Sequence, residues 1–100
     1  MPVEQPQTQH AWWMYTPLLD VGCPDVRAEV IPHMATLGVD ARPIVFPIHL
    51  MPPYAADAGG ERFPIAERLA AQGINLPTFA GLTRDEVRRV ADALRSAIRQ

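Results

Sequence analysis

The chain has 100 residues, 48% apolar and 20% charged, which is enough for one folded domain with a single core and unlike a disordered sequence. Nine arginines, no lysine and eleven acidic residues give a net charge of -2, which argues against a nucleic-acid partner because such binders carry a basic surface. Cys23 is the single cysteine, so an internal disulfide is excluded.

The amino end, MPVEQPQTQH, has neither the basic start nor the apolar centre of a secretion signal. No apolar run approaches the ~20 residues that span a bilayer. We therefore expect a cytoplasmic protein with no membrane partner. Residues 1–9 are expected to form a flexible leader, and residues 10–100 a single domain.

The first two predicted elements are a strand and a helix. Residues 11–19, AWWMYTPLL, are rich in aromatic residues and predict a strand. Because Pro17 cannot donate to a ladder, this strand either lies at a sheet edge or ends at Pro17. Residues 25–37 repeat apolar residues at helical spacing and predict a helix that Asp25 caps. Pro32 interrupts this helix, and we favour a kink over two separate short turns.

The middle of the chain predicts shorter pieces. Residues 39–46 predict a second strand, residues 47–54 a loop, and residues 55–60 only a connector, because AADAGG is small and flexible. A second helix begins near Pro64, since proline favours the first helical position. Residues 74–77, INLP, predict a very short third strand.

The last helix is the clearest prediction. Thr83 and Glu86 have the T-x-x-E spacing of a capping box. Helical spacing assigns four apolar residues to the buried face: Val87, Val90, Leu94 and Ile98. On the exposed face we expect ion pairs at i,i+4 spacing: Asp85 with Arg89, and Arg88 with Asp92.

The order of these elements predicts an α+β fold. We expect a small antiparallel or mixed sheet of about three strands, with about three helices packed on one face. The three histidines and Cys23 lack the spacing of a metal site, so no metal is expected.

Four segments occur together in an order that resembles one known family. They are HAWWMYTPLL, GVDARPIVFPIHLMPPY, RFPIAERLAAQGINLPTFAGLTRDEV and VADALRSAI. Their combined pattern is similar to the carboxyl-terminal end of the DegT/DnrJ/StrS sugar aminotransferases, over roughly residues 11–98. The branch that they resemble most is the perosamine synthetase type, which places an amino group at C4 of a GDP-linked keto sugar.

The resemblance implies a small carboxyl-terminal domain of a fold-type I enzyme that uses pyridoxal phosphate. In that family the cofactor sits mainly on a larger domain, where a lysine forms the Schiff base. The small domain closes one side of the cleft, and the loop corresponding to residues 42–54 approaches the sugar-nucleotide substrate. For this chain alone we expect no cofactor.

Four substrate-binding candidates lie in this loop. Arg42 can contact a phosphate or a carboxylate through its guanidinium fork, or it can satisfy carbonyls at the end of its strand. His49 can bond to sugar hydroxyls or to the pyrophosphate, or it can be a packed histidine bonded to backbone. For Phe46 and Tyr54 the alternative to a ligand contact is simple packing.

Four apolar residues are candidates for an interface with a partner: Trp12, Trp13, Ile48 and Met51. A domain that evolved against a large partner keeps an apolar docking face that monomers rarely expose. We therefore expect the isolated chain to self-associate or to bind a lysine-bearing partner. That partner is either a large cofactor-binding domain or a complete aminotransferase.

The sequence lacks the side chain that this chemistry requires. Transamination by pyridoxal phosphate needs an amine on the enzyme, and the chain has no lysine. Arginine cannot replace it because it stays protonated. We therefore assign no catalytic residue and expect no activity from the chain alone.

Three interpretations remain open. The chain is a fragment, split half or remnant of such an enzyme, or it is a free-standing binding or regulatory module that pairs with a complete aminotransferase. The third is an unrelated small enzyme that uses His49 together with an acid.

Overall fold

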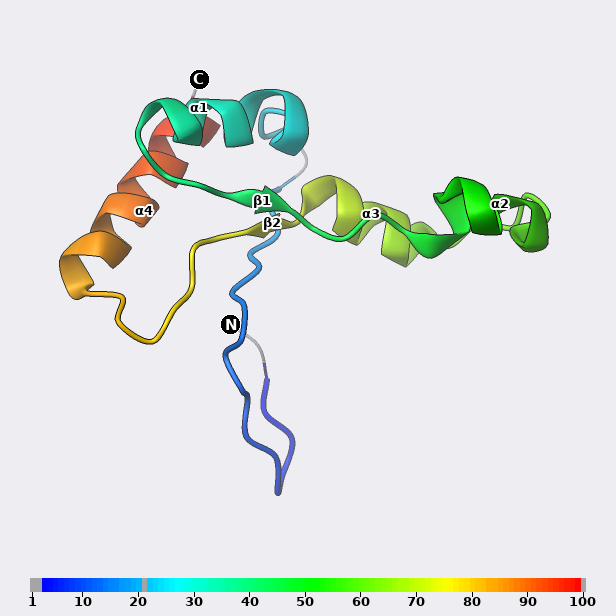
Figure 1. Cartoon of the computed structure of the whole chain (residues 1–100), viewed down its shortest axis with the longest axis horizontal. Helices are drawn as coiled ribbons and strands as arrows, with labels where there is room; N and C mark the ends of the chain where they lie inside the picture. Colours follow the sequence, from blue (N-terminus) through cyan, green and yellow to red (C-terminus); the bar gives the residue numbers. More distant parts are fainter. Residues whose placement is uncertain (1–2, 21, 100) are drawn as a thin grey trace.

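The computed structural model describes residues 3–20 and 22–99, so residues 1–2 of the expected leader lie outside the described residues. The helices of the described part are α1 (Ile31–Thr36), α2 (Pro52–Ala58), α3 (Pro64–Gln72) and α4 (Arg84–Ile98), and the strands are β1 (Arg42–Pro43) and β2 (Ile74–Asn75). A π-helical turn, Val26–Val30, precedes α1, and a 3₁₀ turn, Ile48–Leu50, precedes α2. The predicted α+β class is confirmed (Figure 1).

The two strands of the sheet are short. β1 and β2 pair antiparallel, with Pro43 opposite Ile74. The strand predicted over residues 39–46 shrinks to two residues. Pro43 within it and Pro47 after it lack the N–H group that a longer ladder needs.

The segment predicted as the first strand forms no strand. Residues 11–19 run beside β2 and form two isolated bridges, from Tyr15 and from Leu18. Pro17 accepts a hydrogen bond of 3.1 Å from β2 but has no N–H to return, and Trp12 has a φ of 50°, which a strand does not allow. The described part therefore holds a two-stranded sheet, and the prediction of about three strands is wrong.

The helix predicted over residues 25–37 forms in two parts. Asp25 caps it as expected, because its side chain accepts a hydrogen bond of 2.6 Å from the N–H of Ala28. The π-helical turn comes first, and Pro32 then lies in the first turn of α1. The N–H of Ile31 donates to the carbonyl of Val26, so α1 continues the π-helical turn, and Pro32 leaves one N–H missing in the turn that follows. The interruption expected at Pro32 is thus a change of helix type.

Residues 55–60 are more than a connector, and this prediction is wrong. Most of them lie in α2, which starts at Pro52 and ends at Ala58. Gly59 caps this end in the left-handed conformation, with a φ of 61°. Proline suits the first helical positions, and alanine has the highest helix propensity of all residues. The small side chains that suggested flexibility therefore favour a helix.

The amino end of α4 confirms the predicted capping box. The hydroxyl of Thr83 accepts from the N–H of Glu86, and the carboxylate of Glu86 accepts from the N–H of Thr83, both at 3.2 Å. Its buried face differs in part, because Ala93 and Ala97 are buried whereas Val87 is 49% exposed. Figure 1 shows the reason: the carboxyl half of α4 lies on α1, so its first turn extends beyond the core.

The ion pairs on α4 join residues three apart, so the expected i,i+4 pairs are wrong. Asp85 pairs with Arg88 at 3.9 Å, and Asp92 with Arg95 at 3.2 Å. Arg89 instead donates a hydrogen bond of 3.2 Å to the carbonyl of Leu37, which lies at the carboxyl end of α1. This bond ties α4 to α1 and satisfies an unpaired helix carbonyl.

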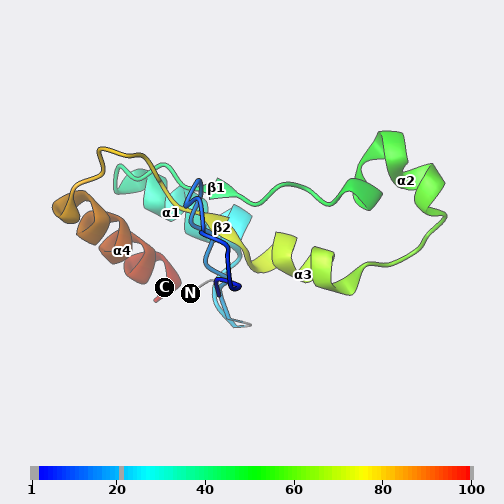
Figure 2. The same cartoon turned by 90° about the horizontal axis from the view of Figure 1, so that it is seen from below.

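The core is small and lies between the π-helical turn, α1, α4 and β2. Its buried apolar residues are Leu19, Val26, Val30, Met34, Val39, Ala41, Ile74, Ala93 and Ala97. Residues 44–72, here called the arm, extend away from this core and carry α2 and α3 (Figures 1 and 2). Neither of these helices contains a buried residue, so the expectation that about three helices pack on one face of the sheet is wrong.

The chain exposes far more surface than a compact domain of its mass. Its accessible surface is 7541 Å², whereas a compact monomer of 11.1 kDa exposes about 5,700 Å². Its radius of gyration is 15.6 Å, against about 13 Å for a compact domain of 100 residues. The excess of roughly 1,900 Å² is more than twice the ~800 Å² that one partner contributes to a standard interface. The chain is therefore extended rather than compact.

Gly73 joins α3 to β2 where no side chain fits. A Cβ at this position would lie 2.7 Å from the carbonyl oxygen of Leu69 and 3.2 Å from Cδ1 of Ile44. Because the carbonyl cannot move without opening the end of α3, we expect Gly73→Ala to lower the free energy of unfolding by about 1–3 kcal/mol. Urea denaturation followed by circular dichroism measures this value. Gly81→Ala is the matched control, since its Cβ meets only ordinary contacts at 3.5 Å or more. Equal effects at the two positions would contradict the expected crowding.

Candidate functional site

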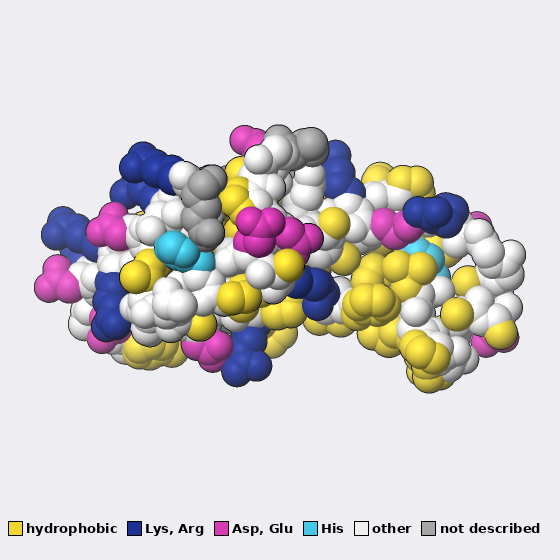
Figure 3. Space-filling view, turned by 90° about the horizontal axis from the view of Figure 1, so that it is seen from above, with side chains coloured by type: hydrophobic (Ala, Val, Ile, Leu, Met, Phe, Trp, Pro, Cys, Tyr) yellow, Lys and Arg dark blue, Asp and Glu magenta, His cyan; other side chains and the backbone are white. Residues whose placement is uncertain are grey.

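The 3₁₀ turn Ile48–Leu50 places His49 in a groove of the arm. The imidazole packs edge-on against Phe63, with 4.7 Å between ring centroids and an angle of 62° between the rings. His49 and Tyr54 line the same open groove, which has a volume of about 620 Å³. Figure 3 shows the apolar side chains that gather over this part of the molecule. Two of the four substrate-binding candidates therefore share a site.

One nitrogen of His49 is buried without a partner. The side chain is 9% exposed, and its Nε2 makes no hydrogen bond to the described residues. The carboxylate oxygen Oε2 of Glu67 lies 3.6 Å away, which is too long for a hydrogen bond. A buried polar group without a hydrogen bond costs about 1–3 kcal/mol. Nε2 makes no hydrogen bond to the backbone, but the ring is packed against Phe63, so the alternative of a packed histidine stays open.

Glu67 on α3 is committed to other donors. The Nε–H of Arg62 donates to its Oε1 at 3.0 Å, and the backbone N–H of Phe63 donates to its Oε2 at 3.0 Å. The hydrogen bonds from Arg62 hold the pKa of Glu67 below its usual value and raise the pKa of Arg62. At neutral pH Glu67 is thus an ionised carboxylate that anchors the start of α3 and lies at ion-pair distance, 3.6 Å, from Nε2 of His49.

This contact makes the arm sensitive to acid. The pKa of Glu67 is lower in the folded chain than in the unfolded one, so the contact stabilises the fold above the unfolded pKa and is lost as the pH falls through the folded pKa. We expect Arg62→Gln to raise the pKa of Glu67 toward the ordinary value of about 4.3. Carboxyl ¹³C NMR titration measures it, with Arg68→Gln on the same helix as the control. A pKa of Glu67 that both variants leave unchanged would contradict this assignment.

Phe46 lines a different groove, of about 280 Å³. The guanidinium carbon of Arg27 lies 5.9 Å from the centroid of its ring, in a cation–π arrangement. Arg27 also donates a hydrogen bond of 3.2 Å to the carbonyl of Ile44. Phe46 is 47% exposed, so about half of its surface remains accessible.

Arg42 lies on β1, at the root of the arm, and lines neither groove. Its Nη2 donates to Oδ2 of Asp40 at 3.1 Å, and the two side chains are 74% and 76% exposed. An ion pair this exposed contributes little to stability. Arg42 thus bonds to a carboxylate rather than to strand-end carbonyls, and a ligand phosphate can replace that carboxylate.

The four interface candidates lie in two parts of the molecule. Trp12 and Trp13 belong to the amino-terminal segment, whereas Ile48 and Met51 belong to the arm (Figure 1). Trp13 and Ile48 are the most exposed of the four, at 79% and 65%. Met51 is half-buried. The four residues therefore do not make one continuous face.

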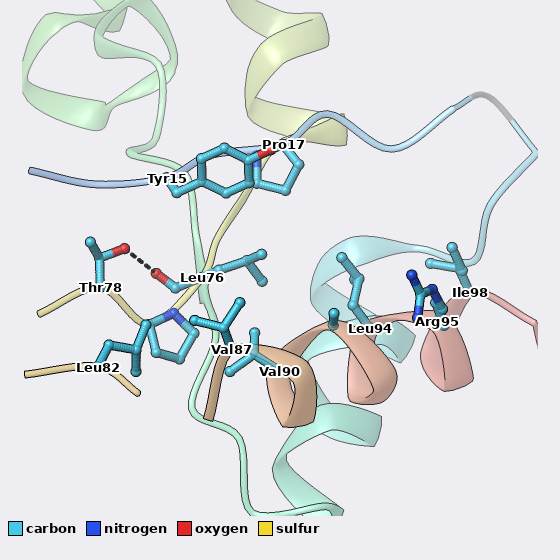
Figure 4. Close-up of a pocket in the computed structure, with 12 residues that line it drawn as sticks. Tyr15, Pro17, Leu76, Thr78, Leu82, Val87, Val90, Leu94, Arg95 and Ile98 are labelled. Carbon is cyan, nitrogen blue, oxygen red and sulfur yellow. Dashed lines mark hydrogen bonds between the residues drawn. The ribbon is translucent and has the colours of Figure 1, made fainter. Parts of the chain in front are cut away.

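Sequence reasoning missed a groove between α4 and residues 76–82, here called the α4 groove (Figure 4). Its volume is about 570 Å³, and apolar side chains from both sides line it. The signal for it is the width of the apolar surface on α4. That surface includes the buried Ala93 and Ala97 together with the partly or fully exposed Val87, Val90, Leu94 and Ile98.

Two classes of site find no support in the described residues. Across residues 3–20 and 22–99, no group of three or more His, Cys, Asp and Glu side chains is arranged to hold a metal ion. No helix in these ranges combines the length and the apolar character needed to cross a membrane.

The comparisons with known proteins point to one family. Residues 1–95 match the DegT/DnrJ/EryC1/StrS aminotransferase family. A GDP-perosamine synthase of Caulobacter vibrioides is 44% identical over 86 residues, which are 86% of this chain and 23% of that protein. A GDP-perosamine synthase of Escherichia coli O157:H7 is 33% identical over 85 residues, which are 85% of this chain and 22% of that protein.

A relative with a different name also matches. It is a dTDP-3-amino-3,4,6-trideoxy-alpha-D-glucose transaminase of Streptomyces venezuelae, 34% identical over 99 residues, with 95% of this chain and 24% of that protein covered. The chain therefore spans less than a quarter of the length of the curated relatives that it matches.

Proposed function

The chain belongs to the DegT/DnrJ/EryC1/StrS aminotransferase family, and from this premise we propose that it lines the substrate cleft of a cytoplasmic sugar-nucleotide aminotransferase without being catalytic on its own. The similarity to GDP-perosamine synthases supports a GDP-linked keto sugar as the substrate. The observation that carries the proposal is His49, which lines the groove of the arm and whose buried Nε2 makes no hydrogen bond.

The groove offers contacts that suit a sugar. Tyr54, Asp57 and Glu61 line it together with His49. Carboxylates accept hydrogen bonds from hydroxyl groups, and a neutral imidazole accepts one and donates another. We assign the sugar ring to this groove, because two carboxylates would repel a pyrophosphate.

The nucleotide part needs other contacts. Arg42 is an exposed guanidinium at the root of the arm and is the candidate for a phosphate oxygen, which it can bind through two N–H groups. Phe46 is about half accessible and is the candidate for stacking.

Pyridoxal phosphate does not fit this chain alone. The cofactor supplies an electron sink for moving an amino group, and it needs a lysine amine that these 100 residues do not contain. We therefore assign no chemical step to this chain. Its residues bind the substrate, orient it and exclude water, which is how positioning groups assist a reaction that occurs elsewhere in a cleft. The lysine is supplied by a large domain, in the same or another polypeptide.

A chimeric enzyme tests this proposal. Residues 11–98 replace the matched segment of the Caulobacter relative, and amino transfer to a GDP-linked keto sugar is measured for the chimera, for the chain alone and for the relative without the segment. We expect activity only from the chimera. Turnover by the chain alone, or a chimera no more active than the truncated relative, would reject the proposal.

A second candidate function is a regulatory module that pairs with a complete aminotransferase. The large exposed surface favours it as much as it favours a fragment. Tight binding to the intact Caulobacter enzyme, together with failure to restore the truncated one, would support this second function over the first.

A further inference from the structure

The proposed function makes no use of the α4 groove. One wall consists of the apolar stripe of α4 and the other of residues 76–82, with Tyr15 and Pro17 at one end (Figure 4). We infer that this groove receives an amphipathic helix of the large domain that carries the lysine. The inference rests on the proposed function and names the surface through which the two domains join.

The first argument is that the apolar surface of α4 is wider than the core covers. Ala93 and Ala97 are buried in the core, and Val90, Leu94 and Ile98 pack against its edge. The same three residues, together with the 49% exposed Val87, also line the groove. An apolar helix surface that is only partly covered has room for a second neighbour. On the side of the groove, the described part of the chain supplies only the extended residues 76–82.

The second argument excludes a strand as the occupant at the inner wall. The N–H of Leu76 already donates to the carbonyl of Tyr15 at 3.1 Å. The carbonyl of Leu76 accepts from the hydroxyl of Thr78 at 3.1 Å, as Figure 4 shows. At Leu76 the N–H is therefore not free for an added strand. An occupant at this residue binds through side chains, as a helix does.

The third argument concerns length. Val87 to Ile98 spans about 16 Å along the helix axis, which matches three turns of a packed helix. More than three quarters of the length of the Caulobacter relative lies outside the matched segment, so the family provides the missing neighbour. Arg95 is the single charged side chain that lines the groove, and it lies at the rim and is 64% exposed.

Val87→Glu tests the inference, with Leu37→Glu as the matched control. Val87 is 49% exposed and Leu37 is 43% exposed, but Leu37 lies beside the charged side of α4. In the isolated chain both substitutions are expected to shift the melting temperature by under about 1 °C, because neither side chain is buried there. In the chimera, Val87→Glu is expected to lower it by about 5 °C or more, since the carboxylate becomes buried without a partner.

A second measurement uses the isolated chain. The dye anilinonaphthalene sulfonate is expected to bind the open α4 groove, with its fluorescence reduced by Val87→Glu and unchanged by Leu37→Glu. Fluorescence that Val87→Glu leaves unchanged overturns the inference. So does an isolated chain that is a dimer and that Val87→Glu converts to a monomer, because a second copy is then the occupant. An active chimera whose stability Val87→Glu does not change also overturns it, yet leaves the proposed function standing.

Discussion

Met34→Ala is expected to lower the free energy of unfolding of the isolated chain by about 2–5 kcal/mol, the range found when a large core side chain is cut back to alanine. Met34 is fully buried and lies in the small core between α1, α4 and β2. A chain that exposes so much surface has a stability near the lower end of the usual ~5–15 kcal/mol, so this loss consumes much of it. Urea denaturation followed by circular dichroism measures the change.

Met51→Ala is the control for this prediction. Met51 is half-buried at the start of α2, on the arm and outside the core. Its removal leaves no closed cavity, so we expect a loss below about 1 kcal/mol. A loss at Met34 no larger than the loss at Met51 would mean that the chain has no specific core.

His49→Phe is expected to reduce kcat/KM of the chimera about 10- to 100-fold, corresponding to one lost hydrogen bond of roughly 1–3 kcal/mol. The change should be mostly in KM, because the role proposed for His49 is to bind substrate and not to take part in the chemical step. Phenylalanine keeps the apolar packing against Phe63 and removes the unpaired buried nitrogen. The stability of the isolated chain should therefore stay constant or rise, while binding weakens.

This opposite response separates a ligand contact from simple packing. If His49 only packs, His49→Phe leaves the kinetics unchanged. His33→Phe is the control, since the Nε2 of His33 lies 3.0 Å from the hydroxyl of Ser96, between α1 and α4. His33→Phe should leave KM unchanged. An equal rise in KM for both variants would contradict the assignment of His49 to the substrate site.

Local signals predicted the ends of helices well. The cap at Asp25, the capping box of Thr83 with Glu86 and the start of α3 at Pro64 all depend on residues within four positions of each other. The lengths of the strands were harder to predict, because a ladder depends on N–H groups from two segments that are distant in the sequence. The prolines at positions 17 and 43 remove such groups at two points of the same small sheet.

The candidate site was predictable only as a list of residues. The sequence motif singled out His49, but its burial depends on the 3₁₀ turn and on Phe63, fourteen positions later. Glu67 accepts hydrogen bonds from Arg62, and Nε2 of His49 is left without a hydrogen bond. The spacing of residues in the sequence does not show which donor a carboxylate will bind. The α4 groove exists because part of the apolar surface of α4 has no neighbour within the chain. The sequence of one chain does not show which residues of another domain would cover that surface.

A photoreactive sugar nucleotide tests most directly whether the arm lines the substrate cleft. A GDP-sugar that carries a diazirine on its sugar ring is bound to the chimera and irradiated, and the crosslinked peptides are identified by mass spectrometry. We predict crosslinks within residues 47–63, which an excess of unmodified GDP-sugar abolishes. Crosslinks confined to the large domain or to α4, with none on the arm, would contradict the proposed role of this chain.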